Sequence, residues 1–324
     1  MKLIEVIADE NITDTVSDIA KKNNALDFRL AQKGDEGRQA IRMLLLDEMV
    51  QSTLDALQSV VSSHPTARII VFPVDATLPL PKPGKPAKKS TTTSREALYD
   101  TVSKNAVLDS NFIVLVILST LVAAIGLIKN NVAVVIGAMV IAPLLGPNLA
   151  LGLGTALGDM ELMRKALKTN LAGVALAIGI SIILGLTWPF EISSPELLSR
   201  TDVGLDSLAL ALASGAAAAL SLTTGLSSVL VGVMVAVALL PPAATFGLML
   251  GHGQYQLAMG AALLLVANVV CVNLATKIVF MVKGISPRTW WQKEKAKRAM
   301  KIYILVWLTG LVILAIVIYL RGNI

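Results

Sequence analysis

Prolines and glycines interrupt the most apolar part of this chain. The stretch MVIAPLLGPNLALGLG (139–154) carries Pro143, Gly146 and Pro147 within five residues, and proline removes a backbone donor and clashes with the preceding turn of a helix. Backbone opened at membrane depth must be satisfied by protein or by water in a cavity. A broken helix offers free N–H groups, which favour an anion, and free carbonyl groups, which favour a cation. We therefore interpret the break as part of a binding site for a small solute, an anion being one candidate.

Polar side chains near such interruptions are the candidates for contact with the solute. Asn148 follows the first interruption directly, and its amide group both donates and accepts hydrogen bonds. Thr245 follows a second proline pair, and Asn268 and Asn273 lie in a later apolar segment with little else that is polar. For each of these, an ordinary hydrogen bond between helices is the alternative role. The predicted substrate-binding residues are Pro143, Gly146, Pro147, Asn148, Pro241, Pro242, Thr245, Asn268 and Asn273. The same two roles, contact with the solute or a hydrogen bond between helices, are open for Asn170 and Thr223–Thr224.

Catalytic groups are scarce in the apolar segments. No Asp, Glu, Arg or His lies in the middle of one, and Lys277 is expected near an inner end, where it would snorkel to the interface. The chain has two histidines and one cysteine, Cys271. We find no nucleophile–base pair and no spacing typical of a metal site, so we predict no enzyme, no cofactor and no metal. Transport would be passive or coupled through neutral ligands.

The elements that must position these residues are membrane-spanning helices. The chain has 324 residues, 55% of them hydrophobic, with a mean hydropathy of +0.71, and the long apolar runs lie between Phe112 and Leu320. Measured against the roughly 20 residues that a span needs, seven segments qualify, of which the fourth is short enough to be a partial span. They are 111–128, 132–156, 167–188, 206–222, 227–250, 256–280 and 301–320.

An internal repeat relates the two interruptions. With a shift of 95 residues, GAMVIAPLLGPNLALGLG (137–154) aligns with GVMVAVALLPPAATFGLM (232–249) at eight of eighteen positions, Pro147 and Pro242 among them. Each unit, 111–188 and 206–280, holds three spans, and an odd number inverts the second copy in the membrane. We predict an inverted repeat of 3+3 spans, an arrangement typical of secondary transporters. The alternative is that prolines only kink tightly packed helices.

A small soluble domain precedes the spans. Its elements follow the order strand, helix, strand, strand, helix, strand, which predicts a ferredoxin-like α+β domain over residues 1–75. Residues 76–93 form a Pro/Lys linker, and residues 94–110 form an interfacial amphipathic helix with Leu98, Val102 and Ala106 on one side. A turn is expected at Gly34 and Gly37.

Basic residues predict the orientation. The short loop 159–168 and the loop 281–300 are rich in Lys and Arg and fall on the same side if all seven segments cross. This places the N-terminus in the cytoplasm and the C-terminus outside. Small-residue faces at 171–179 and 213–219 predict a homo-oligomer, packing within one protomer being the alternative. The positive net charge of +6 reflects this topology, so we expect lipid and not nucleic acid as the partner.

Three motifs resemble a known family. They are SREALYD (94–100), GLIKNNVAVVIGAMVIAPLLGP (126–147) and GVMVAVALLPP (232–242), and they are similar to the signatures of the domain of unknown function 389 family, the uncharacterised hydrophobic domain membrane proteins of bacteria and archaea. The resemblance implies a multi-pass protein of a prokaryotic inner (cytoplasmic) membrane and supplies no catalytic residues. Asn148 stands where the resemblance leads us to expect an aliphatic residue.

These observations lead to two hypotheses from different classes. The first is a membrane transporter or channel for a small solute, with a cytoplasmic regulatory or assembly domain. The alternative is a membrane-anchored sensor or scaffold, in which the cytoplasmic domain binds a ligand or partner and the spans only assemble. Solute flux discriminates between the two.

Overall fold

The computed structural model describes residues 1–32, 38–64, 66–74, 77, 95–224, 239–285 and 290–322. The chain forms two compact units, Met1–Glu96 and Ala97–Ile324. The predicted turn at Gly34 and Gly37 and almost all of the predicted linker 76–93 lie outside the described residues. The same holds for 225–238, the first part of the fifth predicted span.

The first unit is a four-stranded sheet with two helices. Its elements are β1 (Lys2–Asp9), the 3₁₀ turn η1 (Glu10–Ile12), α1 (Thr13–Lys22), β2 (Asp27–Leu30), β3 (Arg38–Leu45), α2 (Asp47–Val61) and β4 (Arg68–Pro73). The strands lie in the order β2-β3-β1-β4, and all three neighbouring pairs are antiparallel. The predicted order of strands and helices is therefore found.

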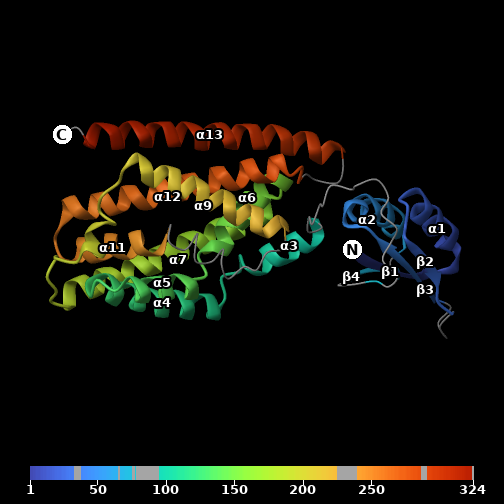
Figure 1. Ribbon diagram of the computed structural model, residues 1–324, viewed down its shortest axis with the longest axis horizontal. Helices are drawn as coiled ribbons and strands as arrows, with labels where there is room; N and C mark the ends of the chain where they lie inside the picture. Colours follow the sequence, from blue (N-terminus) through green and yellow to red (C-terminus); the bar gives the residue numbers. More distant parts are fainter. Residues whose placement is uncertain are drawn as a thin grey trace. The chain divides into compact units, whose positions relative to one another are not determined.

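Alternation of apolar residues builds the core of this sheet. Successive side chains of a strand point to opposite faces, and the buried Ile4 and Val6 of β1 lie on the face where Val16 of α1 and Leu54 of α2 join them in one cluster. Figure 1 shows α1 and α2 beside the sheet. The first unit thus has its own hydrophobic core.

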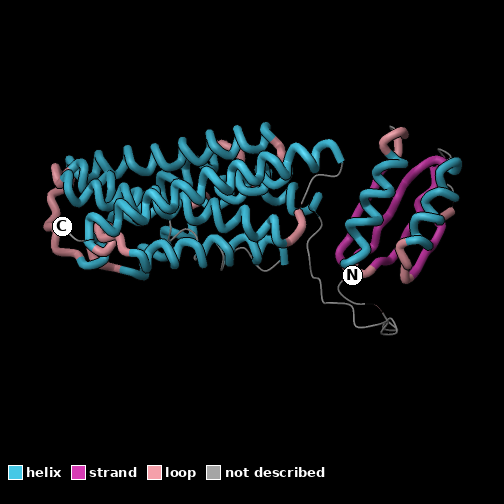
Figure 2. Tube along the Cα trace, turned by 90° about the horizontal axis from the view of Figure 1, so that it is seen from above, coloured by secondary structure: helices cyan, strands magenta, loops and turns pink. Residues whose placement is uncertain are grey.

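The second unit consists of helices that run alongside one another (Figure 2). They are α3 (Arg95–Lys104, whose first two residues belong to the first unit), α4 (Ser110–Ile128), α5 (Val132–Ile141), α6 (Leu145–Leu157), α7 (Met160–Thr187), α8 (Pro195–Leu198), α9 (Leu205–Thr224), α11 (Leu240–Gly251), α12 (Tyr255–Val282) and α13 (Trp290–Gly322).

Polar side chains set several helix starts in this unit. Asp109 accepts a hydrogen bond from the backbone N–H of Phe112 at the start of α4, and Asn131 accepts one from Val134 at the start of α5. Asp159 accepts two at the start of α7. Each side chain satisfies a donor that has no acceptor within the helix. These caps explain why the apolar runs begin where they do.

The second unit has the features of a multi-pass membrane protein. Five helices are long and apolar enough to cross a membrane, namely α4, α7, α9, α12 and residues 303–320 of α13, and the pair α5 and α6 makes a sixth candidate. Large apolar side chains on their outer faces, such as Leu171, Leu210 and Ile313, are more than half exposed, as lipid contact requires. The predicted number of seven spans stays a prediction, because α11 is short and residues 225–238 are not described.

The interruption predicted at Pro143 is found between α5 and α6. The two helices are bent by 50° at the break, and Pro143 lies among the three residues between them. Pro147 lies in the first turn of α6, as Pro241 and Pro242 do in the first turn of α11. The backbone N–H of a first-turn residue has no acceptor within the helix, so proline there removes no hydrogen bond.

Two peripheral helices complete the unit. Leu98 and Val102 of α3 and Ala106 after it are buried in one cluster with Ala150 and Leu153 of α6, as the predicted amphipathic face requires. The other helix, α13 (red in Figure 1), packs against α12 and α6. Only 6% of its apolar segment is buried, against 67% for α12. Lipid would therefore surround most of α13.

Candidate solute site in the membrane bundle

Three asparagines from three helices meet inside the helical bundle. The amide oxygen Oδ1 of Asn148 in α6 accepts a hydrogen bond from Nδ2 of Asn170 in α7 at 2.9 Å and another from Nδ2 of Asn273 in α12 at 3.0 Å. The Nδ2 group of Asn148 donates to the carbonyl oxygen of Leu144 at 3.0 Å. We call Asn148, Asn170 and Asn273 the asparagine cluster. It joins residues 125 positions apart in the sequence.

The asparagine cluster leaves polar atoms without partners. Asn148 and Asn273 are fully buried, and Asn170 is 7% exposed. The Oδ1 atoms of Asn170 and Asn273 are buried and accept no hydrogen bond from any described residue. An unsatisfied buried acceptor costs about 1–3 kcal/mol. Two such atoms in one cluster indicate a place where a bound group would be stabilised.

Two further buried hydroxyl groups lie at close helix crossings. Where α6 crosses α12, a Cβ added to Gly152 would lie 2.5 Å from Cγ2 of Thr276; where α11 crosses α7, a Cβ added to Gly247 would lie 2.5 Å from Cβ of Ser181. Both glycines are therefore required by close helix approach. The hydroxyls of Thr276 and Ser181 are buried and have no hydrogen-bond partner among the described residues.

A pocket of about 390 Å³ lies beside the break in the bent pair. Its lining is polar where α3 leads into α4 and apolar along α4, α5 and α6. The lining residues include Lys104, Asn105, Asp109, Asn111, Phe112, Leu115, Val140, Pro143, Leu145, Gly146 and Leu149. The first-turn N–H groups of α6 face no acceptor within the helix, so this end of the pocket carries partial positive charge.

The first turns of α6 contribute residues both to the pocket and to the asparagine cluster. Gly146 and Leu149 line the pocket, whereas Asn148 between them bonds to α7 and α12. The helix thus presents one face to the pocket and another to the asparagine cluster.

The predicted substrate-binding residues do not all lie in one place. Pro143 and Gly146 line the pocket, and Asn148 and Asn273 form the asparagine cluster. Thr245 is fully buried in α11, and its hydroxyl has no partner among the described residues. Asn268 is buried in α12, but no hydrogen bond among the described residues joins it to the asparagine cluster. The first-turn residues Pro147, Pro241 and Pro242 are buried, and they help to begin their helices.

Several residues of the site do not stand out in the sequence. The sequence leaves two roles open for Asn170, a hydrogen bond between helices or a contact with the solute. The structure shows the hydrogen bond and leaves Oδ1 of Asn170 without a partner among the described residues. Ser181 and Thr276 give no signal on their own. The shift of 95 residues pairs them with each other, as it pairs Gly152 with Gly247, and this double coincidence is the signal that could have found them.

Lys277 differs from its expected role. Its exposed fraction is 1%, and its Nζ lies 4.6 Å from the centre of the Trp307 ring in α13. A cation over an indole ring is attracted by the negative face of the ring. The expectation that Lys277 snorkels freely to the interface is therefore wrong, because α13 covers its ammonium group.

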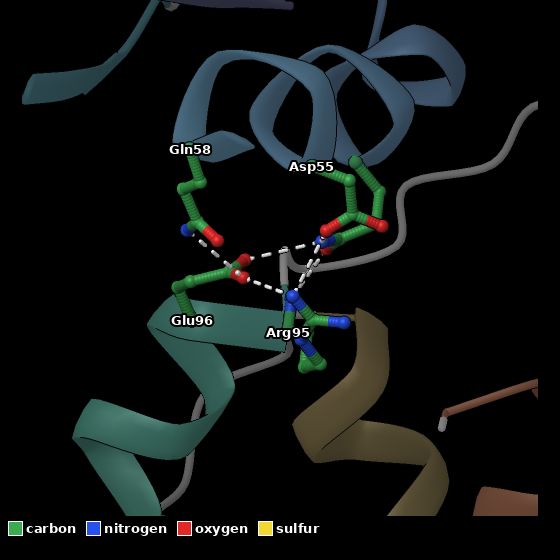
Figure 3. Close-up of polar contacts among 5 residues, drawn as sticks. Asp55, Gln58, Arg95 and Glu96 are labelled. Atoms are coloured by element: carbon green, nitrogen blue, oxygen red, sulfur yellow. Dashed lines mark hydrogen bonds and ion pairs between the residues drawn. The ribbon is translucent and has the colours of Figure 1, made fainter. Parts of the chain in front are cut away.

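Within the first unit, the start of α3 is fastened to α2. Arg95 Nη2 lies 2.9 Å from Oδ1 of Asp55 and 2.6 Å from Oε1 of Glu96, and Gln51 and Gln58 donate to the same Glu96 carboxylate (Figure 3). Burial raises the pKa of the Glu96 carboxyl, but its hydrogen bonds and the Arg95 charge outweigh burial and lower the pKa overall. This polar cluster orders the residues that follow the linker.

The residues that the structure describes contain no group of three or more His, Cys, Asp or Glu side chains placed to hold a metal ion. Amide and hydroxyl groups supply the buried polar atoms of the asparagine cluster and of the helix crossings.

Comparisons with known proteins agree with the motifs in the sequence. The family model described as Domain of unknown function (DUF389) matches residues 139–274, which include the bent pair's second helix and most of α12. An uncharacterized protein of Methanocaldococcus jannaschii, MJ0678, is 38% identical over 253 residues, which cover 78% of this chain and 79% of that protein. No solved structure is significantly similar to the chain.

Proposed function

The chain belongs to the family described as Domain of unknown function (DUF389), and from that premise we propose that it is a transporter or channel for a small solute. The observation that carries the proposal is the asparagine cluster, a buried polar site in an apolar bundle with two unsatisfied amide oxygens. A helix bundle that only anchors a domain gains nothing from such a site, because each unsatisfied oxygen destabilises the fold.

An inverted repeat of 3+3 spans is part of the proposal. The helices α4 and α9 begin at Ser110 and Leu205, and α6 and α11 begin at Leu145 and Leu240, in each case 95 residues apart. The helices α7 and α12 agree at both ends, Met160–Thr187 and Tyr255–Val282. Agreement of helix boundaries supports the repeat independently of the residue identities.

The two glycine crossings support the same symmetry. The shift of 95 residues converts the contact of Gly152 with Thr276 into the contact of Gly247 with Ser181, with the roles of the two repeats exchanged. Such an exchange is what a pseudo-two-fold axis between repeats produces. Broken helices and a site near such an axis are typical of secondary transporters.

The remaining parts of the proposal concern placement. We place the protein in the inner (cytoplasmic) membrane of a prokaryote, with the N-terminus in the cytoplasm and the C-terminus outside, because of the basic loops 159–168 and 281–300. The sheet order β2-β3-β1-β4 supports a ferredoxin-like domain, to which we assign a regulatory or assembly role. Self-association stays in the proposal, although Gly173 and Gly215 pack against residues of the same chain.

The test is solute flux into proteoliposomes that contain the purified full-length protein. The screen should cover inorganic anions, bicarbonate, amino acids and alkali cations. We expect flux above that of protein-free vesicles and a loss of at least roughly ten-fold in Asn273→Leu, equivalent to one lost charge-assisted contact. Asn268→Leu is the matched control, because it changes the same residue type on the same helix outside the asparagine cluster.

Two results would contradict the proposal. Absence of flux for every solute, with the protein folded by size-exclusion chromatography, would favour a membrane-anchored sensor or scaffold. Equal loss of flux in Asn268→Leu and Asn273→Leu would show that transport does not pass through the asparagine cluster.

A further inference from the structure

The orientation of every amide in the asparagine cluster follows from one backbone carbonyl. The carbonyl oxygen of Leu144 can only accept, so the atom of Asn148 that lies 3.0 Å from it must be Nδ2. Oδ1 of Asn148 therefore faces the other two asparagines, and each of them must present its Nδ2 to it. The bond from Asn273 Nδ2 to the carbonyl oxygen of Val269 at 3.0 Å requires the same orientation independently.

With these orientations fixed, the two amide atoms of the asparagine cluster that have no partner are both oxygens. Each of the three Nδ2 groups has at least one acceptor, whereas Oδ1 of Asn170 and Oδ1 of Asn273 have no donor among the described residues. The hydroxyl of Thr276, one turn after Asn273 on α12, is buried and equally without a partner. Amide oxygens carry partial negative charge, and a hydroxyl group can turn its oxygen toward a cation, so these groups favour a cation.

The absence of carboxylates from the asparagine cluster also favours an ion with a single charge. No carboxylate takes part in the asparagine cluster, and the nearest buried charge on α12 is the ammonium group of Lys277, one turn after Asn273 and held over the Trp307 ring. The ligand oxygens would therefore leave the whole charge of an ion uncompensated in an apolar bundle. The cost of burying an ion grows with the square of its charge and is already large for a unit charge. Doubling the charge without a carboxylate would be far more costly.

We infer that the asparagine cluster binds a small monovalent cation, either an alkali-metal ion or an ammonium group, through the amide oxygens of Asn170 and Asn273. The ion is then the solute or a coupling ion. The assignment of the ion as solute or coupling ion rests on the proposed function, whereas the inference that the asparagine cluster binds a cation does not.

The inference is tested with the full-length protein in detergent, by the thermal unfolding midpoint Tm in chloride salts at constant ionic strength. The cations are Na⁺, K⁺, NH₄⁺ and, as a bulky reference, N-methyl-D-glucamine. We expect a saturable rise in Tm with at least one compact cation, unchanged when chloride is replaced by gluconate. A rise with Na⁺ or K⁺ identifies an alkali-metal site, and a rise with NH₄⁺ alone identifies an ammonium site.

Side-chain replacements of similar size locate the binding. Asn273→Leu removes one ligand oxygen and should raise the half-saturating cation concentration at least roughly ten-fold. Asn268→Leu removes an amide from the same helix outside the asparagine cluster and should change that concentration much less. Asn170→Leu removes the other ligand oxygen and should raise it as Asn273→Leu does, while the Tm without cation reports whether each variant is folded.

Opposite results would overturn the inference. A Tm that follows the anion or only the ionic strength would exclude a cation site, and equal weakening of cation binding in Asn268→Leu and Asn273→Leu would place the site elsewhere. Cation binding without flux would keep this inference and refute the proposed function. Flux of some solute without any specific cation effect on Tm or flux would keep the function and refute the inference.

Discussion

Tyr99 connects α3 to the start of α7 through a single carboxylate. Its hydroxyl donates to Oδ2 of Asp159 at 2.8 Å, while Oδ1 of Asp159 accepts the backbone N–H groups of Glu161 and Leu162. The hydrogen bond to Asp159 raises the pKa of Tyr99, and burial and the charges of Asp159 and Glu161 raise it further. One carboxylate therefore caps a membrane helix and fastens the amphipathic helix beside it.

This contact predicts a pH dependence. Because the pKa of Tyr99 in the folded protein lies above the value of about 10 in the unfolded chain, the contact stabilises the fold below pH 10. The stabilisation is lost as the pH rises through the raised pKa. The difference in absorbance at 295 nm between wild type and Tyr99→Phe should titrate above pH 10. Asp159→Asn, which keeps a capping oxygen, should lower the midpoint, and a midpoint at or below 10 would contradict the contact.

The asparagines illustrate how far single residues can be interpreted from sequence. Asn148 and Asn273 could be singled out because a polar amide is costly in an apolar segment. Their mutual contact could not be predicted from the sequence, because it depends on how α6, α7 and α12 pack. Asn268 looks equally suitable in the sequence and lies apart from the asparagine cluster, because helical periodicity places it on a different part of α12.

Gly152 and Gly247 lie at close helix crossings beside buried hydroxyl groups. At the first, only side-chain atoms of Thr276 and Phe280 are near the added Cβ; at the second, the backbone carbonyl oxygen of Ile178 lies 2.6 Å from it. A side chain can be shortened by mutation and a backbone cannot. The two crossings should therefore respond differently to the same substitution.

We expect Gly152→Ala to lower the free energy of unfolding by about 1–3 kcal/mol, because of overpacking. Thr276→Ser removes the methyl group that the new Cβ would meet, so the double variant should recover most of the loss in thermal denaturation. Failure of Thr276→Ser to rescue would mean that Phe280 or the helix backbone limits the approach.

For Gly247→Ala we expect a loss of similar size that Ser181→Gly does not repair, because the carbonyl oxygen of Ile178 still blocks the new Cβ. Gly179→Ala is the control. No atom lies within 4 Å of its Cβ position in α7, so the change should be neutral or stabilise by up to about 1 kcal/mol. Full rescue by Ser181→Gly would refute the backbone contact.

At the level of elements, sequence patterns predict starts and breaks better than contacts. The break at Pro143 and the order of strands and helices in the first unit depend on local rules for proline and for alternating apolar residues. The split of the second predicted span into α5 and α6 also follows from those rules. The pocket beside the break could not be predicted, because it depends on the approach of residues 104–112 to α6.

The whole molecule combines a soluble α+β unit with a multi-pass helical unit. The exposed apolar faces of its long helices suit lipid, and the buried polar atoms gather where α6, α7, α11 and α12 pack. Amino-acid composition predicts this division of the chain, because apolar runs are confined to the second unit. Orientation in the membrane depends on the basic loops alone.

Orientation can be measured with single cysteines in a Cys271→Ala background, since Cys271 is the one native cysteine. Glu191 and Lys165 are both exposed at opposite ends of α7. A membrane-impermeant maleimide should label Glu191→Cys in intact cells, and Lys165→Cys only after lysis. The reverse pattern would invert the proposed topology, and equal labelling of both in intact cells would mean that α7 does not cross the membrane.

The asparagine cluster has no counterpart in the second half of the proposed inverted repeat. The shift of 95 residues carries Asn148 to Ala243 and Asn170 to Leu265, although it preserves both glycine crossings. In a carrier with nearly equivalent halves, such an off-axis site has unequal affinity in the inward-facing and outward-facing forms. Half-saturating concentrations measured from the two faces then differ. With equal concentrations on both faces there is no net flow, so the maximal rates in the two directions must differ by the same ratio as the half-saturating concentrations. Under steep gradients the protein would therefore transport faster in one direction than in the other, without any energy source.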